Sequence, residues 1–183
     1  GADALGFIFV EGTPRYIDPA DAAAIIDTLP PFVTPVGVFW DHLPGRIKDV
    51  ARVAQLGALQ FHGQEPPESL ADYRLPVIKT MKLDSAADLV RFDGYQVSAF
   101  LLDSPARWSE GEPRQPIQWD LARQAANRGR IILSAGLTPD NVVEAIRIAR
   151  PYGVDVNSGV EARPGKKDPD KVRRFIAQAK ETL

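Results

Sequence analysis

Seven short apolar segments alternate with amphipathic segments along nearly the whole chain, and this alternation limits the possible folds. The apolar segments, rich in Val, Ile and Phe, are Ala4–Phe9, Pro35–Phe39, Ala58–His62, Val77–Met81, Ala99–Asp103, Arg130–Ser134 and Val154–Asn157. The segments between them carry apolar residues at three- and four-residue spacings, which is typical of helices. Regular alternation of strand and helix favours a parallel sheet buried on both faces, either a doubly wound open sheet or a closed barrel.

The helices are predicted by the same periodicity. They are Pro19–Leu29, Leu43–Gln55, Ser85–Phe92, Trp119–Arg128, Pro139–Ala149 and Pro169–Lys180, with a shorter helix over Glu68–Tyr73. Three of them are predicted to begin at a proline that follows a side chain able to cap the helix, namely Asp18, Thr138 or Asp168. The chain lacks a GxGxxG sequence, which argues against a nucleotide-binding open sheet.

The strand count bears on the barrel alternative. A (β/α)8 barrel needs eight strand–helix units, and seven strands are visible in the 183 residues. The chain opens directly on a strand at Gly1–Ala4, so we expect the first βα unit to be the absent one. A barrel left open would expose two unpaired strand edges, which native proteins avoid. The length predicts a single domain over residues 1–183.

Two successive strands in the last third end in turns of small residues. They read IILSAGLTPDNVVEAI over 131–146 and GVDVNSGVEARPGKKD over 153–168. Backbone N–H groups in such turns, in front of a helix, can bind an anion. In parallel α/β barrels a phosphate site forms after strands seven and eight. The pair of turns therefore predicts a phosphorylated small-molecule substrate.

Three polar residues lie at or beyond strand ends, where barrel chemistry takes place. Asp103 closes the strand FLLD and is a candidate general acid or base, or alternatively a cap for the next turn. His62 closes QFHG and is a candidate site residue or a structural histidine. Arg15 could clamp a carboxylate or form a surface salt bridge. The irregular segment Ser104–Pro116 is long enough to act as a lid.

Composition excludes several functions. A net charge of −2 provides no basic field for nucleic acid or an anionic membrane, and no apolar run approaches the length of a membrane span. The absence of cysteine excludes disulfides and thiolate chemistry, and with two histidines a metal site is not expected. We expect a cytoplasmic protein without a leader. Glu161 and Lys166–Lys167 are expected to be solvated charges. Trp40, Trp108 and Trp119 lie at or near loops after strands, where an aromatic side chain could stack on a substrate ring, but we expect them to be packing residues.

The motifs, taken in chain order, resemble the phosphoribosylanthranilate isomerase family of tryptophan biosynthesis, a pathway of aromatic amino acid biosynthesis. The resemblance runs through GADALGFIF, TPRYI, VGVFW, LQFHGQE, PVIKTMK, FLLD, LSAGLTPDNVVEAI and YGVDVNSGVEARPGKKDPDKVRRFI, essentially the whole chain. The combination of QFHG with DVNSGVE and PGKKD is its most specific part. The resemblance implies a (β/α)8 TIM barrel and an Amadori rearrangement of N-(5-phosphoribosyl)anthranilate to 1-(2-carboxyphenylamino)-1-deoxyribulose 5-phosphate, with no cofactor and no metal.

The resemblance also implies roles for individual residues. Asp103 takes the place of the general acid, Arg15 engages the anthranilate end and His62 forms part of the pocket wall. The implied phosphate-binding residues are Gly136, Asp155, Ser158 and Gly159. The family's catalytic cysteine, on the first strand, has no counterpart in the chain. Two further departures are Ala135, where the family often has glycine, and the loop 104–116, where Gly111 is the one glycine.

The sequence also allows functions other than that of this isomerase. A non-catalytic relative or fragment would bind a phosphorylated ligand without a general base. Another phosphosugar barrel enzyme, a ribulose-phosphate epimerase or an indole-glycerol-phosphate synthase, would need metal ligands or a catalytic lysine. Lys79 is the candidate for that lysine, although a buried lysine paired with a carboxylate is the better interpretation. Either a monomer or a homodimer fits the sequence.

Overall fold

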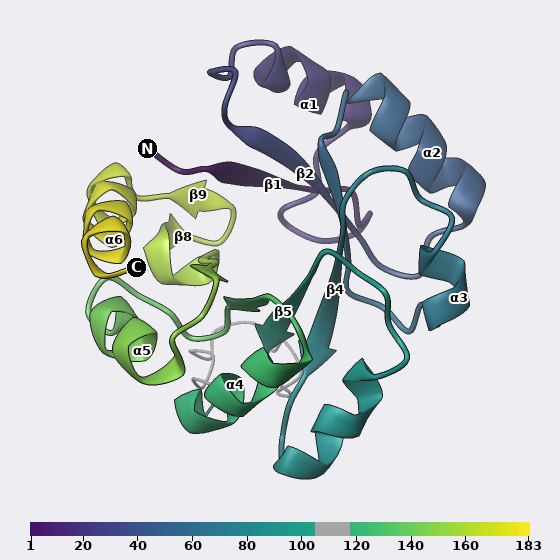
Figure 1. Cartoon of the computed structure of the whole chain (residues 1–183). Helices are drawn as coiled ribbons and strands as arrows, with labels where there is room; N and C mark the ends of the chain where they lie inside the picture. The colour runs from purple at the N-terminus through teal and green to yellow at the C-terminus, as the bar shows by residue number, and fades with distance from the viewer. Residues whose placement is uncertain (105–117) are drawn as a thin grey trace. The chain divides into compact units, whose positions relative to one another are not determined.

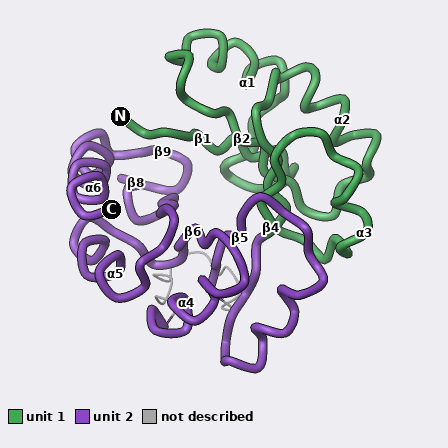
Figure 2. The backbone as a smooth tube through the Cα atoms, in the orientation of Figure 1, with its two compact units in different colours: residues 1–79 green, residues 80–183 purple. Residues whose placement is uncertain are grey.

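The computed structural model describes residues 1–104 and 118–183, and it divides into two compact units, residues 1–79 and 80–183 (Figures 1 and 2). In each unit, strands joined by helical segments pair in parallel with their neighbours. The predicted α/β class is therefore confirmed. The single domain and the eight-stranded barrel stay predictions. Trp108, Gly111 and the proposed lid, apart from Ser104, lie outside the described residues.

The first unit contains β1 (Ala4–Ile8), α1 (Pro19–Ile26), β2 (Thr34–Phe39), α2 (Pro44–Val53), β3 (Ala58–Phe61), α3 (Pro67–Leu70) and the start of β4 (Val77–Lys82). Successive strands pair in chain order, with Gly6 opposite Val36, Val38 opposite Gln60 and Phe61 opposite Lys79. This register places the carboxyl ends of all its strands at one edge.

The core of the first unit is a row of aromatic rings. Phe39 stacks on Phe9 with ring centroids 5.6 Å apart and lies 6.1 Å from Phe61, which in turn lies 5.3 Å from Tyr73. Phe9, Phe39 and Phe61 are all buried. Because Phe39 and Phe61 are the last residues of β2 and β3, the row of rings packs at the carboxyl ends of both strands.

The second unit holds the rest of β4, η1 (Ala86–Phe92), β5 (Ala99–Asp103), α4 (Trp119–Ala125), η2 (Ala126–Arg128), β6 (Ile131–Leu133), α5 (Val142–Ala149), β7 (Gly153–Val154), η3 (Ser158–Val160), β8 (Glu161–Arg163), β9 (Lys166–Lys167) and α6 (Pro169–Thr182). Strands β5, β6 and β7 pair in parallel, and β8 and β9 form a separate antiparallel ribbon. The buried core joins the strands to α4, α5 and α6. No helix among the described residues is long and apolar enough to span a bilayer.

Six of the predicted strands occur among the described residues, whereas the last, predicted over Val154–Asn157, is found at Gly153–Val154 and overlaps the prediction only at Val154. Two predicted helix starts are also confirmed. The carboxylate of Asp18 accepts a hydrogen bond from the N–H of Ala20 at 2.8 Å, and that of Asp168 accepts from Asp170 and Lys171. In both helices proline occupies the first turn, as expected.

Three helical predictions were wrong in detail. The helix predicted from Pro139 begins at Val142, because the Asn141 side chain accepts from the Thr138 N–H and donates to the Gly136 carbonyl, which keeps the preceding residues in a turn. The segment after Ser85 is a 3-10 helix. The helix predicted over Glu68–Tyr73 is the shorter α3, Pro67–Leu70. The ribbon β8–β9 was not predicted.

We expect Gln55→Gly to stabilise the protein. Gln55 follows α2 with φ 54°, and the N–H of Leu56 closes the helix on the Ala51 carbonyl at 3.0 Å. The left-handed conformation costs a residue with a Cβ about 1–2 kcal/mol. Glycine avoids this cost but has a higher conformational entropy in the unfolded chain, so the free energy of unfolding should rise by about 1 kcal/mol. Gln55→Ala, which keeps the Cβ and removes the exposed bond to Asp27, is the control. Denaturant unfolding that ranks the glycine variant at or below the alanine variant would contradict this prediction.

Candidate active-site residues

At the carboxyl edge of the first unit, two aromatic side chains from neighbouring strand ends stack on each other. Trp40 follows β2 and His62 follows β3, and their rings lie 6.4 Å apart with an interplanar angle of 20°. The His62 ring also lies 2.5 Å from the side-chain nitrogen of Gln60, measured from Nε2. Trp40 is 48% exposed, so the expectation of a packing residue was wrong for Trp40, whereas Trp119 packs partly buried against the core of the second unit.

Arg15 lies on the segment that leaves β1. The next residue, Tyr16, bridges to Ile8, the last residue of β1, and the N–H of Ile17 donates to the Ile8 carbonyl at 3.0 Å. The side chain of Arg15 is half-buried. Both Arg15 and His62 thus belong to the carboxyl edge of the first unit, as the sequence predicted.

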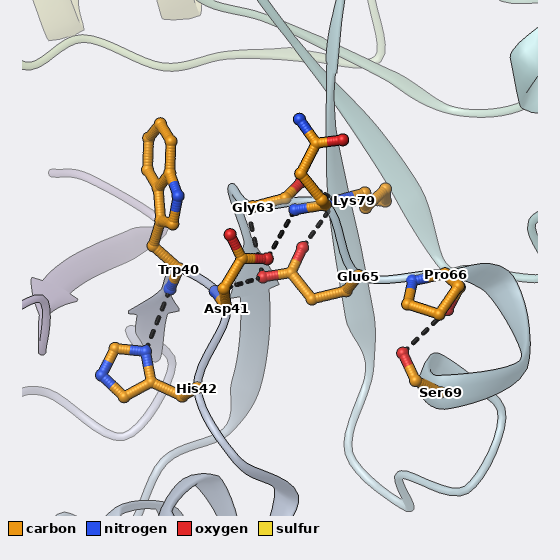
Figure 3. Close-up of polar contacts among 9 residues, drawn as sticks. Trp40, Asp41, His42, Gly63, Glu65, Pro66, Ser69 and Lys79 are labelled. Atoms are coloured by element: carbon orange, nitrogen blue, oxygen red, sulfur yellow. Dashed lines mark hydrogen bonds and ion pairs between the residues drawn. The ribbon is translucent and has the colours of Figure 1, made fainter.

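A buried ion pair connects β4 with the loops that follow β2 and β3 (Figure 3). Lys79 of β4 donates from Nζ to Glu65 Oε2 at 2.7 Å and to the carbonyl of Gly63 at 2.7 Å. The two side chains are only 4% and 8% exposed. The prediction that Lys79 is a buried lysine paired with a carboxylate is confirmed, and its engaged ammonium does not support the synthase alternative.

The second carboxylate oxygen of Glu65 binds main-chain donors. Its Oε1 accepts from the N–H of Asp41 at 2.9 Å and from that of Gly63 at 3.2 Å. In return, Asp41 Oδ1 accepts from the N–H of Gln64 at 2.6 Å. The ion pair therefore ties the loops after β2 and β3 to β4. Sequence reasoning missed Asp41 and Glu65, because their partners become neighbours only in the folded chain.

Opposing effects set the pKa of Glu65. Burial acts to raise it, but the hydrogen bonds from Lys79 and from the Asp41 N–H, with the Lys79 charge, lower the pKa below its ordinary value of 4.5. Burial and the negative charge of Glu65 raise the pKa of Tyr73 above 10.0. Glu65 is therefore an anion at neutral pH and does not act as a proton donor there.

In the second unit, Asp103 ends β5 and is buried, with 6% of its surface exposed. Its Oδ1 accepts a hydrogen bond from the N–H of Ser104 at 2.9 Å, which orients the carboxyl group. The position at the carboxyl end of a buried parallel strand is the one predicted for an acid or base.

The two small-residue turns of the second unit contact each other. A Cβ placed on Gly159 would lie 1.8 Å from the carbonyl oxygen of Leu137, so only glycine permits this approach. Within the first turn Ala135 and Gly136 have φ of 62° and 66°. The Asn141 side chain donates to the Gly136 carbonyl at 2.9 Å and holds the turn closed. The pairing of these turns agrees with the sequence prediction, which had not included Asn141.

The remaining predicted residues lie beside these turns. Asp155 follows β7, and its carboxylate accepts from the buried hydroxyl of Ser134 at 3.0 Å, while its N–H donates to the Leu133 carbonyl at 2.8 Å. Ser158 is exposed at the start of η3. Ser134 was missed because a serine at a strand end carries no signal without its partner.

The expectation that Glu161 is a solvated charge was wrong. Glu161 is buried, and its Oε1 accepts from Lys167 Nζ at 3.2 Å and from the N–H of Gly165 at 3.3 Å. Lys167 also donates to the carbonyl of Asn157 at 2.8 Å and to its side chain. The β8–β9 ribbon therefore supports the turn that contains Ser158. No group of three or more His, Asp or Glu side chains in residues 1–104 and 118–183 could hold a metal ion.

These features define a class of protein: a parallel α/β scaffold with a buried acid at a strand end and paired glycine turns suited to an anion. The sequence profile of N-(5′-phosphoribosyl)anthranilate isomerase matches residues 1–178. The chain therefore belongs to the N-(5′-phosphoribosyl)anthranilate isomerase family. The resemblance inferred from the motifs is confirmed, and with it the expected isomerase function in tryptophan biosynthesis.

Individual relatives agree with this assignment. The isomerase of Trichlorobacter lovleyi is 48% identical over 184 residues, which cover all of this chain and 90% of the relative. The crystal structure of the Thermotoga maritima enzyme is 43% identical with a TM-score of 0.89, over 99% of this chain and 89% of that one. Another isomerase structure, 42% identical with a TM-score of 0.86 over 99% and 89% of the two chains, is a complex with reduced 1-(o-carboxyphenylamino)-1-deoxyribulose 5-phosphate.

A fall in pH should lower the free energy of unfolding, partly through protonation of Glu65. Since its folded-state pKa lies below 4.5, the carboxylate contributes stability that is fully present above pH 4.5 and is lost as the pH falls through the folded-state value. At pH 7, Glu65→Gln leaves Lys79 buried without its counter-charge and should lower the free energy of unfolding by about 3 kcal/mol. Denaturant unfolding from pH 7 to 3 should show this difference shrinking with acid. A difference that grows would refute the assignment.

Proposed function

We propose that the chain converts N-(5-phosphoribosyl)anthranilate to 1-(2-carboxyphenylamino)-1-deoxyribulose 5-phosphate, with Asp103 as general acid. The observation that carries this proposal is the buried carboxyl group of Asp103 at the end of β5, oriented by the N–H of Ser104. A positioned carboxyl group with limited access to water is suited to delivering one proton to a reacting oxygen. Family membership supplies the reaction.

In the proposed mechanism, Asp103 protonates the oxygen of the ribose ring. The bond from this oxygen to the anomeric carbon breaks, and the nitrogen lone pair forms a Schiff base. Loss of the proton from the second sugar carbon then gives an enolamine, which tautomerises to the ketose. The resemblance attributes this second proton transfer to a cysteine, and because the chain contains none, we assign the base to no residue.

Arg15 and His62 are proposed to bind the anthranilate end. The planar guanidinium of Arg15 can form two parallel hydrogen bonds with a carboxylate. His62 presents an aromatic ring at the same strand edge, stacked on Trp40. A carboxylate beside an aromatic ring is the chemistry of anthranilate, so the two residue types match the two parts of this group.

The proposed phosphate-binding residues are Gly136, Asp155, Ser158 and Gly159. Gly159 allows the two turns to approach and Gly136 has φ 66°, so backbone N–H groups of both turns can face one anion. The carboxylate of Asp155 accepts a hydrogen bond from the Ser134 hydroxyl, and the Asp155 N–H donates to the Leu133 carbonyl, so neither group is offered to an anion. Its role in this set is therefore to position the turn.

Three finer expectations are also proposals. An eight-stranded barrel is supported by the agreement between strand order and chain order in each unit. Either a monomer or a homodimer is proposed, since one similar Thermotoga maritima structure, 40% identical, is of monomers generated from a dimeric isomerase. A cytoplasmic location is supported by the family's place in amino acid biosynthesis.

Asp103→Asn tests the proposed role of Asp103 as general acid. The amide can still accept from the Ser104 N–H but cannot supply the proton, so kcat should fall by a factor of about 10² to 10⁴. Inorganic phosphate should inhibit the wild-type protein. Calorimetry should give the same Kd for inorganic phosphate in the variant as in the wild-type protein. Turnover within a few-fold of wild type would refute the assignment of Asp103. Binding without turnover in the wild-type protein would instead favour the non-catalytic alternative.

Ser158→Glu tests the phosphate-binding turns. A carboxylate at this exposed position would repel a phosphate dianion, so we expect KM to rise about tenfold or more with a smaller effect on kcat. Ser158→Gln has nearly the same size without the charge and serves as the matched control. If both variants raise KM equally, or neither does, the phosphate does not bind at this turn.

A further inference from the structure

The positions of Trp40 and His62 depend on contacts made by their sequence neighbours. Asp41 directly follows Trp40, and its N–H donates to Glu65 Oε1 at 2.9 Å. Gly63 directly follows His62, its N–H donates to the same oxygen, and its carbonyl accepts from Lys79. The ion pair therefore holds the main chain immediately after each of the two stacked rings.

The junction between the two loops is tight. A Cβ on Gly63 would lie 2.2 Å from Asp41 Oδ1 and 2.7 Å from the Asp41 nitrogen. Asp41 itself has φ 51°, a left-handed conformation that is uncommon for residues with a side chain. Such a conformation persists where surrounding contacts determine it, and here the partners are Glu65 and the N–H of Gln64.

Trp40 is also fixed from its other side. Its own N–H donates to His42 Nδ1 at 3.2 Å, and the His42 ring meets the edge of Phe39, 5.6 Å away. An indole that is 48% exposed while its main chain is held this firmly is suited to contact a ligand. Figure 3 shows Trp40 on the loop that carries Asp41, with Glu65 and Lys79 on the far side of Asp41.

We propose that the Glu65–Lys79 ion pair, acting through Asp41 and Gly63, positions Trp40 against His62, and that Trp40 contacts the aromatic ring of the substrate. This inference rests on the proposed function, because it takes His62 to line the anthranilate end. It adds Trp40 as a specificity-determining residue and Glu65, Lys79 and Asp41 as positioning residues. None of these four acquires a role in the proton transfers.

The test is a double-mutant cycle on the whole protein, with anthranilate and inorganic phosphate as separate probes. Trp40→Ala and Glu65→Gln should each raise the Kd for anthranilate about tenfold, measured by calorimetry well below the unfolding temperature. A glutamine at 65 would turn an NH2 group toward either Lys79 or the main-chain donors, so it cannot satisfy both. The Kd for inorganic phosphate should not change.

The combined variant separates positioning from general destabilisation. If Glu65 acts through the stacked pair Trp40–His62, the two losses should be less than additive, so Trp40→Ala/Glu65→Gln should bind anthranilate more tightly than the two single losses together predict. Fully additive losses, an unchanged Kd for anthranilate in Glu65→Gln, or equal weakening of phosphate binding would each overturn the inference. Asp170→Asn makes the same chemical change in an exposed ion pair with Arg173 and should leave both Kd values unchanged.

A second variant protects the test against loss of folding. Gly63→Ala disturbs the junction with Asp41 and leaves both members of the ion pair in place, so it should weaken anthranilate binding in the same way. Unchanged anthranilate binding in folded Gly63→Ala would also overturn the inference. Turnover distinguishes the two proposals. If the variants change the Kd for anthranilate as expected but the wild-type protein does not convert the substrate, the proposed function alone is refuted. If the wild-type protein converts the substrate but the variants do not change the Kd for anthranilate in this way, this inference alone is refuted.

Discussion

Parallel pairing of strands that follow one another in the chain is the constraint on which the rest of the structure depends. With Gly6 opposite Val36, Val38 opposite Gln60 and Phe61 opposite Lys79, each strand ends at the same edge as its neighbours. The residues after each strand therefore meet, although helices separate them in the sequence. Both groups of site residues arise in this way, one after the ends of β1, β2 and β3 and the other at or after the ends of β5, β6 and β7.

The two groups are stabilised by different means. In the first unit a buried ion pair binds main-chain groups from two loops, so a charged interaction in a nearly dry environment determines the loop conformation. Such a pair contributes little net stability over apolar residues, yet loss of one member is costly. In the second unit the contact is between main chain and main chain, and it depends on the absence of a side chain at Gly159.

The sequence was sufficient to predict the strands, the caps at Asp18 and Asp168, and the strand-end positions of Asp103 and His62, since all of these depend on local pattern. It could not predict the acceptor of Lys79, because Glu65 becomes its neighbour only through the register of β3 and β4. The same holds for Asp41, whose partner is 24 residues away. The start of α5 was misplaced because the hydrogen bonds of Asn141 outweigh the preference of Pro139 for a first turn. Glu161 was misjudged because the ribbon that buries it gives no periodic signal.

The contact between Gly159 and Leu137 also constrains how the chain can evolve. Every amino acid other than glycine places a carbon where the Leu137 carbonyl already lies, so position 159 can change only if the turn after β6 moves at the same time. Mutations in the two turns are then interdependent, and a substitution tolerated in one lineage would be rejected in another. Libraries that diversify this protein should therefore vary both turns together and keep the glycine, while the loops after β2 and β3 can be explored as a separate set.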